Sequence, residues 1–115
     1  MSNAQDVKDF TQATGTECPS APKAMDAEAT RFIIRMVMSE LCELACTVTD
    51  TAAERDDLMQ QALDTRDRCK NFDYKDDTHL IAAQFDALVD SWYYSLNTAA
   101  KHGVNMSSIF DIVHG

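Results

Sequence analysis

Apolar residues recur at helical spacing between Asp26 and Thr49. Asp26 is a favourable N-cap, and Glu28 in the first turn suits the positive end of a helix dipole. The spacing of four, four, three and four predicts one long helix that ends at about Thr49. Its expected core stripe consists of Ile33, Val37, Leu41, Leu44 and Val48.

A second helix is predicted directly afterwards. Thr51-Ala52-Ala53-Glu54 is a capping box, so this helix starts after almost no loop and is expected to extend to about Asn71. So short a connection makes the two helices antiparallel neighbours. Most of the charges on the second helix are expected to form a solvated face. Its apolar stripe consists of Leu58, Met59, Ala62 and Cys69.

A third long helix is predicted from about His79 to His102, with Asp77 or Thr78 as its cap and Gly103 as its stop signal. Asn105 caps a last short helix, 106–114. A further short helix over 5–13 and a Gly/Pro-containing loop over 15–23 precede the first long helix. The core stripe of the third helix consists of Ile81, Phe85, Leu88, Trp92, Leu96 and Ala99.

These elements predict an all-α fold: an antiparallel, four-helix-bundle-like domain of three long helices and a short C-terminal one. Three glycines and two prolines among 115 residues agree with a helical chain. We expect residues 1–115 to form a single domain, with 1–25 as an N-terminal arm and loop. A bundle this small with Met-rich, aromatic helices has apolar surface left to cover, so we expect a homodimer or homotetramer.

The formal net charge of −9 disfavours nucleic acid and anionic membranes as partners. No stretch has the length of a membrane span and no signal sequence is evident, so a cytoplasmic protein is expected. The four cysteines form no Cys-x-x-Cys, although Cys42 and Cys46 lie one helical turn apart. They are expected to be buried or half-buried thiols without zinc.

Two pairs of acidic residues interrupt the apolar segments. Glu40 and Glu43 lie on one face of the first long helix, and Asp86 and Asp90 lie on one face of the third. Like charges at this spacing repel by roughly 0.2–0.5 kcal/mol on an open helix, and by more where water is excluded. If both pairs point inward, a divalent cation such as Mg²⁺ is the natural partner. Taken alone, each pair could equally be a solvated helix edge.

A polar stripe continues from the second acidic pair. At about 100° per residue, Asp86, Asp90, Tyr93 and Asn97 fall within roughly 60° of one another on the third helix. Lys101, a turn beyond Asn97, extends the stripe with a positive charge.

With both pairs on helices, the pattern resembles the all-α nucleoside triphosphate pyrophosphohydrolases, the superfamily that includes the MazG-like and phosphoribosyl-ATP pyrophosphohydrolase-like proteins. Their usual motifs are Glu-Glu-x-x-Glu on one helix and an acidic pair that ends in Asp on a later helix. Glu40 and Glu43 match the second and third Glu, and Asp90 matches the closing Asp. Asp86 matches the first acid of an Asp-x-Leu-x-Asp variant in which an aromatic residue follows, as Tyr93 does here.

The resemblance implies a hydrolase that cleaves between the α- and β-phosphates of a nucleotide and releases a monophosphate and pyrophosphate. It implies Mg²⁺ or Mn²⁺ as cofactor, with Glu40, Glu43 and Asp90 as ligands and Asp86 as a ligand or its support. Glu40 or Glu43 would serve as the catalytic base, Glu40 being favoured by its place in the motif. The substrate-binding candidates are Tyr93, Asn97 and Lys101.

Two positions depart from the family pattern. Ser39 replaces the first Glu of the first motif, and Ala87 stands where many members carry a Glu. The main alternative is therefore a binding or interaction protein that keeps the fold and is catalytically impaired. A di-iron carboxylate bundle is disfavoured, because the chain contains no Glu-x-x-His.

Overall fold

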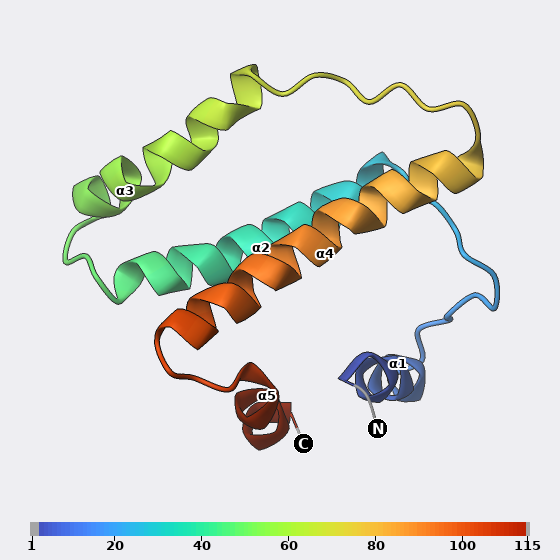
Figure 1. Cartoon of the computed structure of the whole chain (residues 1–115), viewed down its shortest axis with the longest axis horizontal. Coiled ribbons are helices and arrows are strands. Elements are labelled where there is room, and N and C mark those ends of the chain that lie inside the picture. Colours follow the sequence, from blue (N-terminus) through green and yellow to red (C-terminus); the bar gives the residue numbers. More distant parts are fainter. Residues whose placement is uncertain (1–2, 115) are drawn as a thin grey trace. The chain divides into compact units, whose positions relative to one another are not determined.

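The computed structural model describes residues 3–114, which form α-helices, one 3-10 turn and connecting loops (Figure 1). The predicted all-α class is confirmed. None of the described helices is both long and apolar enough to cross a membrane. The chain divides into two compact units, one up to Ala24 and from Asp76 onward, the other Met25–Lys75. The elements are α1 (Asn3–Ala13), α2 (Ala27–Cys46), α3 (Ala52–Asp64), a 3-10 turn (Thr65–Asp67), α4 (Asp77–Lys101) and α5 (Met106–His114).

Helix α2 begins at the predicted cap. The Asp26 carboxylate accepts a hydrogen bond from the Ala29 amide at 2.8 Å, which satisfies one of the free amides of the first turn. The helix ends at Cys46, three residues before the predicted end at Thr49. Three successive β-branched residues, 47–49, lower helix propensity there. The hydroxyls of Thr47 and Thr49 also cap the last turn, donating to carbonyl oxygens of α2 at 2.6 and 2.7 Å.

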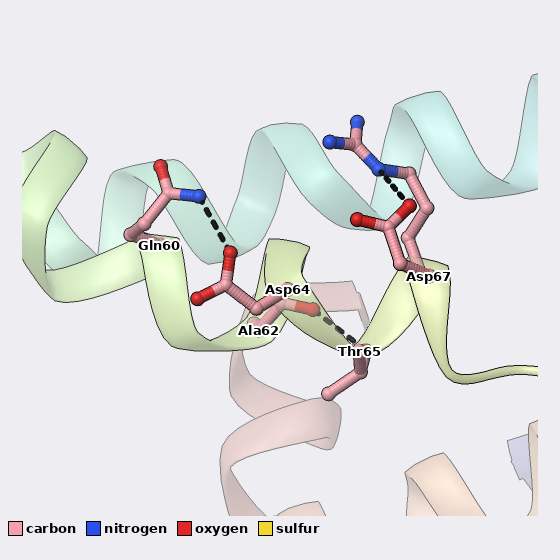
Figure 2. Close-up of polar contacts among 6 residues, drawn as sticks. Gln60, Ala62, Asp64, Thr65 and Asp67 are labelled. Carbon is pink, nitrogen blue, oxygen red and sulfur yellow. Dashed lines mark hydrogen bonds and ion pairs between the residues drawn. The ribbon is translucent and has the colours of Figure 1, made fainter.

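Helix α3 also begins as predicted and ends early. The Thr51 hydroxyl accepts from the Glu54 amide at 3.1 Å, half of the expected capping box. The α-helix ends at Asp64 rather than near Asn71, and a 3-10 turn follows. In Figure 2 the Thr65 hydroxyl donates back to the Ala62 carbonyl at 2.7 Å, and Gln60 donates to Asp64 at 2.8 Å. The Thr65 bond to a backbone carbonyl competes with continuation of the α-helix, whereas the Gln60–Asp64 pair at i, i+4 supports the turn before it.

The cap of helix α4 is Asp76, so the prediction of Asp77 or Thr78 was wrong. The Asp76 carboxylate accepts from the His79 amide at 2.7 Å. This cap lets the helix begin two residues before the predicted start at His79, and the helix ends at Lys101. Asn105 caps α5 as predicted, accepting from the Ser108 amide at 3.2 Å.

In the unit that contains both ends of the chain, α1 and α5 lie close together. Val7 and Phe10 of α1 line a shared cavity with Phe110 of α5. A second cavity of about 280 Å³ lies between α4 and α5, with Trp92 and Leu96 among its lining residues. The Pro-containing segment 19–23 lies against Ile81, Ala82 and Phe85 on α4.

The other unit is a helical hairpin. Figure 1 shows α3 returning beside α2 in the opposite direction after the short turn 47–51, as the capping box predicted. The Cys42 thiol of α2 contacts the Met59 thioether of α3 at 3.7 Å. This contact is one of those that hold the hairpin together.

The predicted core stripes are largely uncovered. Among the described residues, the buried apolar side chains are Ala45 and Ala99 alone. Leu44 of the α2 stripe is 64% exposed and Trp92 of the α4 stripe is 58% exposed. Ile33, Ile81 and Leu88 are half-buried. The stripes were expected to be a core, and within each compact unit that expectation is wrong for most of their members.

Helix α4 stops at a glycine for a conformational reason. Gly103 has a φ of +70°, and the Gly103 and Val104 amides donate to the carbonyls of Ala100 and Ala99 at 3.2 and 2.9 Å. This is the Schellman arrangement, which needs a left-handed residue. A Cβ at Gly103 would meet nothing within 4 Å, so the cost of a side chain here is backbone strain alone.

We predict that Gly103→Ala lowers the free energy of unfolding by about 1 kcal/mol, because alanine adopts positive φ poorly. Asparagine tolerates that region better, so Gly103→Asn should cost less. Thermal unfolding followed by circular dichroism, at one fixed protein concentration, measures both variants. Equal losses for Ala and Asn would contradict the assignment to backbone strain.

Candidate functional site

The first acidic pair lies in the second half of α2. Glu40 and Glu43 are both exposed, and the i, i+3 spacing places them on neighbouring positions of one face. Neither side chain has a hydrogen bond or ion pair with any residue of 3–114. Both carboxylates therefore keep all their oxygen lone pairs for a ligand.

The second acidic pair lies in the middle of α4. Asp86 and Asp90 are exposed and one helical turn apart. They too have no polar partner among the described residues. Apolar side chains surround them in sequence, and Val89 between them is itself 54% exposed. Within its own compact unit, this pair is therefore not buried.

The substrate candidates continue along the same helix. Tyr93 is 61% exposed and its ring lies 5.9 Å from that of Tyr94, with an interplanar angle of 73°. Asn97 is half-buried and Lys101 is exposed. The helical spacing aligns these side chains with Asp90 on one side of α4. One stripe of α4 therefore carries, in order, a carboxylate, an aromatic ring, an amide and an ammonium group.

The four acids divide between the two compact units. Glu40 and Glu43 belong to the hairpin unit, whereas Asp86 and Asp90 belong to the unit with α4. In the part of the chain that the structure describes, no three His, Cys, Asp or Glu side chains form a group that could hold a metal ion. Each unit supplies two carboxylates, and the convergence of the two pairs stays a prediction.

The donor chemistry of the two pairs fits a hard divalent cation. Mg²⁺ binds through oxygen, usually with one or two carboxylates, waters and substrate phosphates completing its shell. Four exposed carboxylates with no competing cationic partner in residues 3–114 match that requirement. Thiol or imidazole ligands are not needed for such a site.

The two positions that depart from the family pattern are occupied by small side chains. The Ser39 hydroxyl donates to the Arg35 carbonyl at 2.9 Å, so it is engaged with the backbone of its own helix. Ala87 offers no side-chain donor, and its carbonyl accepts from Ser91 at 3.1 Å. Neither position supplies an oxygen ligand equivalent to a glutamate.

Two features were missed or wrongly predicted from the sequence. Cys42, Cys46 and Cys69 are exposed and only Cys18 is half-buried, so the prediction of buried thiols was wrong for three of the four. The Cys42–Met59 contact was not foreseen, although the i, i+4 spacing of Cys42 and Cys46 was a signal of a shared face. Arg31 and Arg35 have no ion pair within residues 3–114.

Arg31 and Arg35 instead line an open groove along α2 with Ser39 and Cys42. The Arg35 guanidinium lies 6.0 Å from the centre of the Phe32 ring, at the limit of a cation–π contact. At about 100° per residue this face lies on the far side of the helix from Glu40. The arginines therefore do not neutralise the Glu40 carboxylate within the same chain.

A comparison with protein families gives a match over nearly the whole chain. The family model described as phosphoribosyl-ATP pyrophosphohydrolase matches residues 7–115 of the chain. Comparisons with curated proteins and with solved structures gave no match.

Proposed function

This chain belongs to the phosphoribosyl-ATP pyrophosphohydrolase family, within the all-α, MazG-like superfamily, and we propose that it cleaves the α–β phosphoanhydride of a nucleotide in a Mg²⁺-dependent reaction. Family membership supports pyrophosphohydrolase activity on a nucleotide. The products would be a nucleoside monophosphate, or its phosphoribosyl derivative, and pyrophosphate. The family's name makes phosphoribosyl-ATP the first substrate to test, followed by nucleoside triphosphates.

One observation carries the proposal. The four carboxylates that match the family motifs are exposed and have no polar partner within residues 3–114. Unpaired like charges at helical spacing are mildly unfavourable in the free protein, and binding of a cation would remove that cost.

Glu40, Glu43 and Asp90 would hold the cation, with Asp86 as a further ligand or as support for one. Bound Mg²⁺ supplies neutralisation of the phosphate charge and orientation of the phosphate chain. Glu40 or Glu43 would accept a proton from the attacking water, since both carboxylates are free to do so. The water oxygen then bonds to phosphorus as the bridging phosphorus–oxygen bond breaks and pyrophosphate leaves.

The stripe on α4 would bind the rest of the substrate. Lys101 offers an ammonium group for a phosphate, and the half-buried Asn97 offers an amide for phosphate or sugar oxygens. Tyr93 presents an exposed ring on which a base can stack. These roles place the substrate along one side of α4, beside Asp90.

The second candidate function is a binding protein that keeps the family fold without full activity. It is favoured by Ser39, whose hydroxyl bonds to a backbone carbonyl where the family motif has a glutamate. It is also favoured by Ala87. The two candidates differ in whether the chain releases pyrophosphate at all.

We further propose that the functional form is a homodimer or homotetramer. Leu44, Trp92 and Tyr94 are each more than half exposed. An exposed apolar surface of this extent marks an interaction site in a soluble protein. A second copy of the chain, which carries the same uncovered stripes, would bury them.

We predict that Glu43→Gln and Asp90→Asn each lower the rate of Mg²⁺-dependent pyrophosphate release by at least about 100-fold, because each removes a charged ligand. The assay would use phosphoribosyl-ATP and a panel of standard and modified nucleoside triphosphates. The matched control is Asp57→Asn on α3, an exposed aspartate outside both motifs. Wild-type activity in either ligand variant would contradict the assignment.

We predict that Ser39→Glu raises the pyrophosphate release rate several-fold, because it restores a carboxylate one helical turn before Glu43. The control is Gln61→Glu, which adds the same negative charge on α3, outside both acidic motifs. This position also lies away from Glu54, whose amide bonds to the Thr51 cap. A wild-type protein and a Ser39→Glu variant that are both inactive on the whole panel would favour the binding protein.

The mass in solution is expected to exceed the 12.8 kDa of one chain at micromolar concentration. Leu44→Glu should shift the protein toward the monomer, because burying an unpaired carboxylate in an interface is costly. Light scattering coupled to size-exclusion chromatography measures both proteins, with Gln61→Glu as the control. A monomeric wild type would exclude the proposed assembly.

A further inference from the structure

Cys42 on α2 contacts Met59 on α3, Cys46 follows Cys42 by one helical turn, and we propose that these three sulfur-bearing side chains form a binding site for a soft monovalent cation of the Cu⁺ type. The ligands are the thiols of Cys42 and Cys46 on α2 and the thioether of Met59 on α3. All three residues belong to the same compact unit. The proposal uses none of the acidic residues and does not depend on the pyrophosphohydrolase activity.

The distance between the first two sulfurs suits a shared ion. The Cys42 sulfur lies 3.7 Å from the Met59 sulfur. In a three-ligand site with an angle of about 120°, two sulfurs that each lie about 2.3 Å from one metal ion are about 4.0 Å apart. The Cys42 and Met59 sulfurs therefore already lie within a few tenths of an ångström of the separation that two ligands of one such ion require.

Cys46 supplies the third sulfur by helical spacing. It follows Cys42 by one turn, and residues four apart on a helix lie one above the other with about 5–6 Å between their Cβ atoms. Both thiols are exposed, so rotation about their side-chain bonds can bring the two sulfurs toward one ion. The exposure also leaves the site open to an incoming ion.

The hairpin fixes the position of Met59, the ligand that comes from α3. Met59 is half-buried. Its helix, α3, is capped by Thr51, which lies five residues after the end of α2 and accepts a hydrogen bond from the Glu54 amide. The hydroxyl bonds of Thr47 and Thr49 fix the end of α2 in the same way. The short turn between these anchors sets the position of Met59 beside Cys42. The ligands thus come from elements that are ordered before an ion binds.

The ligand set selects the type of ion. Thiolate and thioether sulfurs are soft donors that favour Cu⁺, which accepts two or three such ligands. Mg²⁺ requires oxygen donors and is excluded by the same rule. Structural Zn²⁺ takes four ligands from cysteine and histidine, and the three histidines of this chain belong to the other unit.

The test is a titration of the full chain with Cu⁺ under anaerobic, reducing conditions, in competition with a chromophoric chelator of known affinity. We expect one tightly bound Cu⁺ per chain. Cys42→Ser and Cys46→Ser should each weaken binding by at least about 100-fold, because a thiolate ligand is lost. Met59→Leu keeps the apolar volume and removes only the thioether, so it should weaken binding by about tenfold.

Cys69→Ser and Cys18→Ser are the matched controls, since they remove a thiol outside the group. Both should keep wild-type affinity and stoichiometry. Far-ultraviolet circular dichroism of each variant establishes that the helices are retained. Equal weakening by Cys69→Ser and Cys42→Ser, or undiminished binding by Met59→Leu, would overturn the three-sulfur site.

Discussion

The chain carries more apolar helical surface than it buries, and this imbalance underlies the rest of its structure. Helix formation here depends on local bonds: Asp26, Thr51, Asp76 and Asn105 each cap a helix through a side-chain oxygen. Caps of this kind contribute about 1 kcal/mol each. Short and medium helices in water need tertiary burial in addition. Within the described residues only Ala45 and Ala99 are buried apolar side chains, so the missing burial has to come from contacts beyond those inside either unit.

The division of the chain into two compact units also affects the acidic pairs. A cation between two like-charged pairs offsets their repulsion only if the pairs approach each other, and each compact unit carries one pair. Along α2 and α4 the acids stand next to apolar residues that are themselves uncovered, such as Leu41 at 46% and Val89 at 54% exposure. Contacts that cover those side chains would also lower the dielectric constant around the carboxylates. Burial of the stripes and affinity for a cation would therefore rise together.

Helix positions could be predicted from the sequence because caps and stop signals are local. Asp26, the Thr51 capping box and Gly103 all lie where their chemistry required. The ends of α2 and α3 were predicted too late, because threonine hydroxyls that bond to carbonyls close each helix and leave little trace in the hydrophobic pattern.

The site could be predicted only as two separate pairs. The periodicity placed Glu40 with Glu43 and Asp86 with Asp90, and the family motif added their roles. The exposure of the apolar stripes and of three cysteines could not be predicted from the sequence. Helical periodicity identifies an apolar face, but it does not identify the surface that packs against that face. No pattern in the sequence indicated that the face of α2 with Cys42 and Cys46 is exposed.

Helix α2 presents two donor sets of opposite character. Glu40 offers oxygen, and Cys42, about 160° away around the helix axis at 100° per residue, offers sulfur. Hard cations bind the first type of donor and soft cations the second, so the two sets need not compete for the same ion. Ser39 lies between these directions, and its hydroxyl bonds to the Arg35 carbonyl. A glutamate there would extend the oxygen set toward the sulfur side, whereas serine leaves the two sets apart.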